Sequence, residues 1–245
     1  MQKYGLIMII FMLFSLLPDD QAAGNWLQRG KDAFQERTSA ASDAGLSDSE
    51  ITRGLKEALR TGSENVISHL GRENGFYQDP KAHIPLPESL QRVQGILDRA
   101  GRGHMLEDLE LRMNRAAEKA TPRARDIFTQ AIAAMTLEDV REILSGPDDS
   151  ATRYFQGKMS EPLADEFTPI VQEGLSEAGA VQTYDDLMGE YRRLPFVPDV
   201  RADLTSHVVD HALEAIFDYL AVEEAGIRND PVQRTTDILR RVFGR

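Results

Sequence analysis

The sequence predicts an all-α protein, a compact single-domain array of about eight to ten helices that follows a signal peptide. Two observations support this class. Apolar residues recur at helical spacing through most of the chain, and no convincing alternation of apolar and polar residues indicates a β-strand. The segments between the periodic runs are short, within the usual range of roughly 2–8 residues for connections between helices.

The composition of the chain limits its function. Hydrophobic residues make up 41% of the 245 residues and charged residues 28%, a balance that allows a sizeable core. The net charge of −12 repels phosphates and anionic headgroups, so we expect no nucleic-acid partner. The chain has no cysteine, which excludes disulfides, thiol catalysis, thiolate metal sites and a lipoprotein anchor.

Residues 1–24 have the layout of a secretory signal peptide. Lys3 supplies positive charge, Leu6–Leu17 is an apolar run, and small residues follow Pro18. The apolar run is shorter than the roughly 20 residues of a membrane span, so we expect no stable membrane insertion after cleavage. An uncleaved anchor is the alternative. These features predict a periplasmic or secreted bacterial protein.

Two regions follow the predicted signal peptide. Residues 25–45 are expected to form a flexible or partly helical segment, because a few apolar side chains precede a run of small polar ones. Residues 46–245 are expected to form the helical domain.

Each predicted helix has its own start and stop signals. Ser47 and Glu50 form a capping box at the first start, and Gly71 is expected at the C′ position of that helix. Pro169 is expected to kink a later helix near Phe167. The expected helices cover 47–70, 87–100, 104–120, 121–135, 136–145, 148–155, 160–178, 183–193 and 204–229, and a closing helix follows residue 230.

Residues 75–87 are expected to form an irregular segment, because prolines at 80, 85 and 87 force extended backbone before them. Its apolar residues are expected to pin the segment across the helices. The alternative is a ligand-lining loop that uses His83. On the helix expected over 104–120, Asn114 lies beside the apolar stripe and is predicted to be buried and hydrogen-bonded.

The main candidate site is the charged cluster within the long periodic run Leu204–Phe243. The pair Glu224 and Arg228 has the spacing of an ion pair on a helix, and Asp230 followed by proline is typical of a helix start. These local roles leave two further charged residues of the cluster, at 234 and 237, unexplained. The residues predicted to bind a ligand or partner are Tyr154, Glu223, Glu224, Arg228, Arg234 and Asp237.

A metal site is the alternative, on the same long helix. His207, His211 and Glu214 share one face, and two histidines one turn apart are able to hold Zn²⁺. However, Val208 stands where a zinc-protease motif has its glutamate, and the opposite face is apolar. Because amphipathicity alone predicts this pattern, we expect a polar or solvated face and no metal.

No motif for nucleophilic catalysis or for a nucleotide cofactor occurs. The chain contains neither a G-x-S-x-G elbow nor a P-loop nor a G-x-G-x-x-G sequence, so no cofactor is expected. The sequence favours a non-catalytic protein and leaves the question of an enzyme open.

Five stretches of the chain carry a family resemblance. They are LSDSEITRGLKEAL at 46–59, HIPLP at 83–87, NRAAEKA at 114–120, ATRYF at 151–155 and the whole of 204–244, which includes AVEEAGIRNDPVQRTTDILRRVFG. With these stretches the chain resembles an uncharacterised bacterial family of exported all-helical proteins, a domain of unknown function. The resemblance implies one helical domain in the bacterial envelope and brings no activity. The two histidines of the metal alternative lie outside the family's pattern.

These inferences favour a non-catalytic binding or scaffold module of the bacterial periplasm, whose partner is an unknown envelope protein or a small ligand. The alternative is a metal-dependent hydrolase that uses His207, His211 and Glu214.

Overall fold

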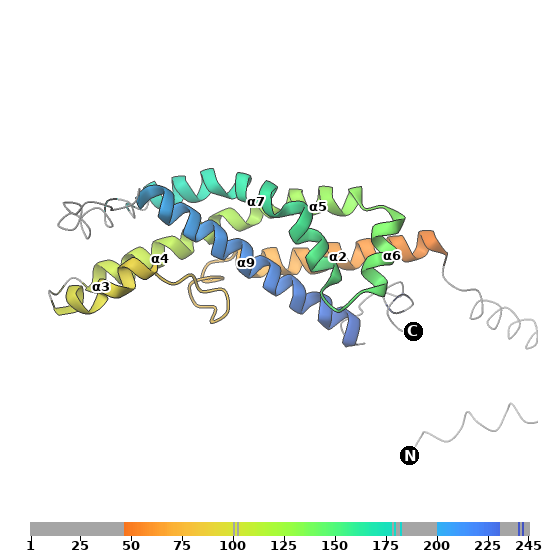
Figure 1. Ribbon diagram of the computed structural model, residues 1–245, viewed down its shortest axis with the longest axis horizontal. Helices are drawn as coiled ribbons and strands as arrows, with labels where there is room; N and C mark the ends of the chain where they lie inside the picture. Colours follow the sequence, from red (N-terminus) through yellow and green to blue (C-terminus); the bar gives the residue numbers. More distant parts are fainter. Residues whose placement is uncertain are drawn as a thin grey trace, which may run out of the picture. The chain divides into compact units, whose positions relative to one another are not determined.

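The computed structural model describes residues 47–99, 101, 103–177, 179, 182, 200–230, 240 and 242 (Figure 1). The predicted signal peptide, the segment 25–45, the helix expected at 183–193 and the closing helix lie outside these residues, apart from positions 182, 240 and 242. In the part of the chain that is described, none of the helices is both long and apolar enough to cross a membrane.

Helices form all the regular structure of the described residues, which confirms the all-α class. These residues hold fewer α-helices than the eight to ten predicted for the whole domain. The elements are α2 (Asp48–Leu70), α3 (Glu88–Arg99), α4 (Gly103–Ala120), the 3-10 helix η1 (Thr121–Arg123), α5 (Ala124–Ala134), α6 (Leu137–Ser145), α7 (Ser150–Glu177) and α9 (Val200–Asn229).

Helix α7 accounts for one difference from the predicted count. The separate helices predicted over 148–155 and 160–178 are wrong, because α7 is continuous and contains both Pro162 and Pro169. Each proline removes one backbone bond, but both lie on the exposed face, where water can bond to the released carbonyl groups. The ribbon of α7 changes direction along its course in Figure 1, as expected for a helix that contains prolines.

Contacts between the helices place α7 and α9 against each other and α4 against α7, while α2 packs against α9 and α5. One connected cluster of buried apolar side chains draws on all of these helices. Close approach matters at Gly174 of α7, where a Cβ atom would lie 3.3 Å from the Cβ of Ala116 in α4. A larger side chain at that position would push α4 and α7 apart.

The connection between α2 and α3 is irregular, as predicted. Gly71 is the C-cap residue of α2 with a right-handed φ of −79°, and the left-handed residue is Asn74, with a φ of 64°. The expected C′ role of Gly71 is therefore wrong by one position. A glycine is still favoured there, because a Cβ atom would lie 2.8 Å from the carbonyl oxygen of Ile67.

The side chain of Asn114, on α4, binds the backbone of the α2–α3 connection. Its side chain is fully buried, its Oδ1 accepts the amide of Ile84 at 2.9 Å, and its Nδ2 donates to the Ile84 carbonyl at 2.9 Å. Ile84 and Phe76 are themselves buried in the core. The predictions of a buried, hydrogen-bonded Asn114 and of a segment pinned by its apolar residues are confirmed.

Candidate functional site

The carboxylate of Glu224, on the last part of α9, caps the start of α7. Its Oε1 accepts the amide of Ala151 at 2.9 Å, and its Oε2 accepts the amide and the hydroxyl of Thr152, both at 2.9 Å. The first amides of a helix have no partner within the helix, and the helix dipole favours a negative charge there. Glu224 thus completes α7 from a distant part of the chain.

Arg228 completes the same corner from the other side. Its Nη2 donates to Glu224 Oε1 at 2.9 Å and to the carbonyl oxygen of Ile143, near the end of α6, at 2.7 Å. The side chains of Arg228 and Glu224 are only 10% and 6% exposed. The pair therefore joins α6, α7 and α9, and we call Glu224, Arg228 and their partners on α6 and α7 the corner.

Two other residues predicted for the site, Glu223 and Tyr154, are more exposed. Glu223 Oε2 accepts the side-chain amide of Asn65 in α2 at 3.1 Å. Tyr154, on α7, is half-buried, its ring centroid lies 5.6 Å from that of Phe155, and burial and the charge of Asp139 raise its pKa. Arg234 and Asp237 lie outside the described residues. Ligand binding by this set remains a prediction.

The histidine face of α9 makes a polar contact with the α2–α3 connection. Nε2 of His207 lies 2.7 Å from the carbonyl oxygen of Pro85 and, since a carbonyl only accepts, carries the proton. Burial lowers the pKa of His207. His211 Nδ1 lies 3.5 Å from Glu214 Oε2. Among the described residues no cluster of three or more potential ligands is arranged for a metal ion. The contact with Pro85 leaves Nε2 of His207 unable to ligate.

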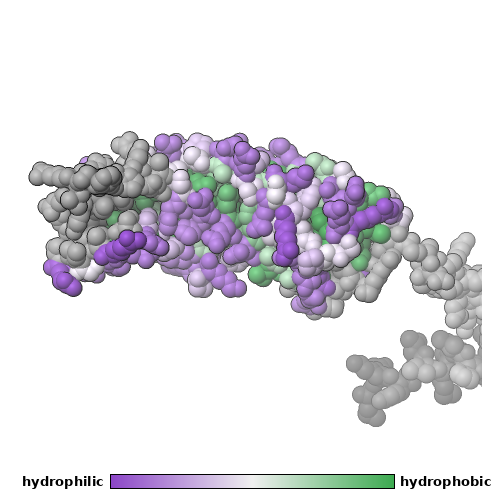
Figure 2. Space-filling model, viewed as in Figure 1, coloured by the Kyte–Doolittle hydropathy of each residue, from purple (hydrophilic) through white to green (hydrophobic). Residues whose placement is uncertain are grey.

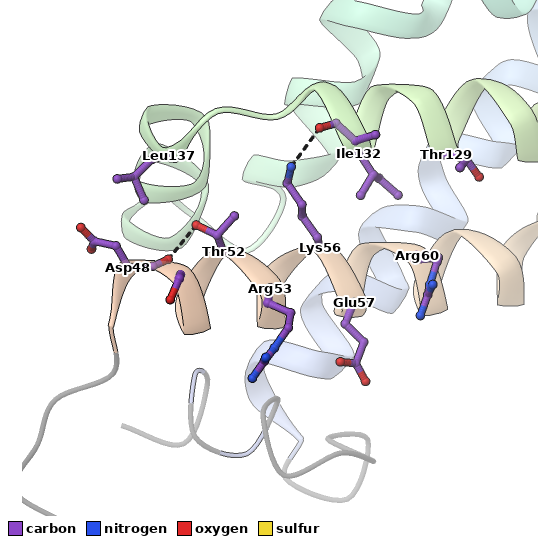
Figure 3. A pocket seen from close by; sticks show the side chains of 11 residues that line it. Asp48, Thr52, Arg53, Lys56, Glu57, Arg60, Thr129, Ile132 and Leu137 are labelled. Atoms are coloured by element: carbon purple, nitrogen blue, oxygen red, sulfur yellow. Dashed lines mark hydrogen bonds between the residues drawn. The ribbon is translucent and has the colours of Figure 1, made fainter.

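A groove of about 760 Å³ lies along α2 where this helix meets α5 and α6 (Figure 3). In Figure 3 Lys56 points toward α5, and its Nζ donates to the Ala133 carbonyl at 3.0 Å, whereas Arg53 and Arg60 point away from α5. The lining residues are Asp48, Ser49, Thr52, Arg53, Lys56, Glu57, Arg60, Thr129, Ile132, Ala133 and Leu137. We call this feature the α2 groove.

Comparison with known proteins identifies the chain at the level of a family. The family described as "Protein of unknown function (DUF4197)" matches residues 45–244. The chain belongs to this family. No match was found among curated proteins or among solved structures. The DUF4197 match includes the corner and the α2 groove, and the family's description states no activity.

Sequence reasoning missed Asp79, one of the most highly connected carboxylates among the described residues of this DUF4197 protein. Asp79 Oδ2 accepts the hydroxyl of Tyr219 at 2.6 Å and lies 2.9 Å from Nε2 of His69, while its Oδ1 accepts the amides of Lys81 and Ala82. Burial alone would raise the pKa of Asp79, but these hydrogen bonds outweigh it and hold the pKa well below its usual range.

The hydrogen bond between Tyr219 and Asp79 also changes the pKa of the Tyr219 phenol. Burial and the bond to the Asp79 carboxylate raise the pKa of Tyr219 to about 12. An aspartate before a proline is a frequent turn residue, because its side chain accepts amides two and three positions later. That signal was present at Asp79–Pro80, whereas the contacts with His69 and Tyr219 depend on the fold.

Proposed function

We propose that this DUF4197 protein is an exported, non-catalytic binding or scaffold module of the bacterial envelope, which holds a partner protein in the α2 groove. The observation that carries this proposal is the groove itself. It combines a long row of polar residues on α2 with apolar contacts from α5 and α6. One of these is Leu137, a large apolar residue that is 36% exposed.

The corner supports a binding role less well than the groove does. The oxygens of Glu224 accept hydrogen bonds from α7 and from Arg228, and the guanidinium of Arg228 also donates to α6. A partner that bound these atoms would have to replace bonds that hold three helices together. Figure 2 shows hydrophilic side chains over much of the visible face with apolar patches between them, so partner contact at the surface does not need the corner.

The open form of the groove favours a protein partner over a small ligand. Small ligands are usually enclosed in a pocket, with about 70–90% of their surface buried. Most of the groove's lining is exposed, including Ser49 and Arg60 on α2 and Thr129 on α5. The α2 part of the lining runs from Asp48 to Arg60, about 18 Å at roughly 1.5 Å per residue, which suits a helix or an extended segment.

The proposed place in the envelope rests on the sequence. A positive start, a short apolar run and small residues precede residue 25, and the absence of cysteine fits a compartment where thiols would oxidise. Fractionation of the native cells tests this part. We expect a shortened chain in the periplasmic fraction, and a full-length chain in the cytoplasm would contradict export.

Photocrosslinking in the native cells tests the groove. A crosslinking amino acid replaces Thr129 or Ala133 in separate variants, and Gln156 and Glu166, on the exposed face of α7, serve as control positions. We expect one discrete adduct with an envelope protein at the groove positions only, followed by direct binding of that protein when purified. The same adduct pattern at all positions, or none at the groove, would refute the proposal.

A further inference from the structure

We infer that the α2 groove takes an acidic amphipathic helix, with apolar residues toward α5 and α6 and glutamates or aspartates along α2. This inference rests on the proposed function and specifies the chemistry of the partner.

The charge of the groove carries the inference. Arg53 and Arg60 lie seven residues apart on α2, and in Figure 3 both point away from α5, whereas Lys56 points toward α5. Of the two acidic residues of the lining, Asp48 pairs with Arg141 of α6 at 2.7 Å. Arg53 and Arg60 thus stand beside a single remaining carboxylate of the lining, that of Glu57, while Lys56 Nζ donates to the Ala133 carbonyl.

Two of these cations have unused binding capacity. Within the described part of the chain, no carboxylate lies within ion-pair distance of Arg53 or Arg60, and both side chains are exposed. Many other arginines do have a carboxylate partner in the fold. They are Arg92, Arg112, Arg115, Arg125, Arg141, Arg153 and Arg228. In a chain with 40 acidic and 28 basic residues, these two exposed arginines give the groove a positive edge that an acidic segment would complement.

The apolar part of the groove specifies the shape of the segment. Ile132 lies at the base with 6% exposure, and Leu137 stands at one end with 36% exposure. An apolar strip beside a row of charges matches a helix whose apolar and charged residues lie on adjacent faces. The lining from Asp48 to Arg60 offers a little more than three turns, so a partner helix of about 12 residues would fill it.

The negative charge of the whole protein sharpens the expected selectivity. A net charge of −12 repels acidic segments from most of the surface, so an acidic helix is held only where the cations of α2 outnumber the carboxylates. Nucleic acids present a far denser charge over a long distance and meet the repulsion of the whole protein.

The test uses a labelled helical peptide of about 14 residues, with a leucine face flanked by glutamates, and a second peptide with lysine at each glutamate position. Fluorescence anisotropy measures binding of each peptide to the purified protein. We expect the glutamate peptide alone to bind, and its affinity to fall as NaCl rises from about 50 mM to about 500 mM, because salt screens exposed charges.

Charge-reversal variants locate the binding. Arg53→Glu with Arg60→Glu should weaken the glutamate peptide about tenfold or more. The matched control, Arg123→Glu with Lys158→Glu, changes the net charge equally outside the groove and should change affinity less than about twofold. Leu137→Asp should also weaken binding, because the apolar contact is lost.

The outcomes separate the inference from the proposed function. Equal binding of both peptides, no binding of the glutamate peptide, or indifference to the Arg53 and Arg60 reversals would overturn the acidic-helix inference. The proposed function stands in these cases if crosslinks from Thr129 still reach an envelope protein. Crosslinks from Thr129 to a second copy of this chain, or to its own residues 231–245, would overturn both.

Discussion

The corner and the α2 groove use arginine in opposite ways. At the corner Arg228 is 10% exposed and bonds both a carboxylate and a backbone carbonyl. Along the groove Arg53 and Arg60 are exposed, and no described carboxylate pairs with them. Two charged residues of the predicted site, Glu224 and Arg228, are therefore part of the packed structure, whereas the charged residues of an ordinary helix face are exposed along a groove.

Three carboxylates of the described residues accept hydrogen bonds from two backbone amides each, and two of these carboxylates lie outside the corner. Glu224 accepts the first amides of α7, Asp79 accepts two amides of the α2–α3 connection, and Glu118 accepts those of Phe76 and Tyr77 at 3.1 and 3.2 Å. Each places negative charge beside backbone amides, several of them buried or partly buried, that have no other partner in the described fold. These three carboxylates thus bind backbone amides, whereas Arg53 and Arg60 at the groove have no carboxylate partner among the described residues.

The largest expected effect is at Glu224. Glu224→Ala leaves Arg228 buried without its carboxylate and the first amides of α7 without an acceptor, so we expect a loss of about 3–5 kcal/mol in unfolding free energy. Glu223→Ala, one residue away, should cost less than about 0.5 kcal/mol. Urea denaturation of both variants measures the difference. Equal losses would remove the distinction between internal and surface charge in this cluster.

A smaller loss of unfolding free energy is expected at Tyr219, which bonds the Asp79 carboxylate away from the corner. Tyr219→Phe removes a hydrogen bond to the Asp79 carboxylate, and we expect a loss of about 1.5 kcal/mol at neutral pH. Tyr154→Phe, which alters a half-buried tyrosine, is the control and should change stability little.

The pH dependence of this variant has a defined sign. Because the folded protein holds the pKa of Asp79 low, its stabilisation is present above the unfolded pKa of about 3.9 and is lost as pH falls below it. Removing the phenol raises the folded pKa of Asp79, so the gap between Tyr219→Phe and the unaltered protein should narrow below about pH 4. A gap that stays constant from about pH 7 to about pH 3 would contradict the role of this hydrogen bond.

The smallest expected effect is at the groove. Arg53→Gln with Arg60→Gln should change the unfolding free energy by less than about 0.5 kcal/mol, since exposed side chains without ion-pair partners contribute little to stability. Thermal and urea unfolding of the double variant measure this. A loss above about 1 kcal/mol would show that the two arginines support the fold and would end the contrast with Arg228.

Local signals were predictable from sequence, and long-range ones were not. The capping box of Ser47 and Glu50 forms as expected, because both of its bonds lie within one turn. The spacing of Glu224 and Arg228 predicted their ion pair, but no local rule links Glu224 to Ala151 and Thr152, 73 and 72 residues away. The groove forms only when α2, α5 and α6 are packed together, so no local sequence pattern marks its lining residues.

The prolines of α7 show a second limit of prediction from sequence, which concerns where a helix ends. The sequence places Pro162 and Pro169 inside what becomes one helix, and standard rules end a helix at such residues. Whether a helix continues depends on which face the proline occupies, since only exposed carbonyls can turn to water. That face is decided by packing against α4 and α9, which is not visible in α7 alone.

The packing of α2 against α9 also determines when the protein can finish folding. The Asn65–Glu223 hydrogen bond joins residues 158 positions apart, and α9 contributes one side of the core that α2, α4 and α7 share. In a chain that emerges N-terminus first, the part of the α2 face that α9 covers therefore lacks its partner until α9 has been synthesised.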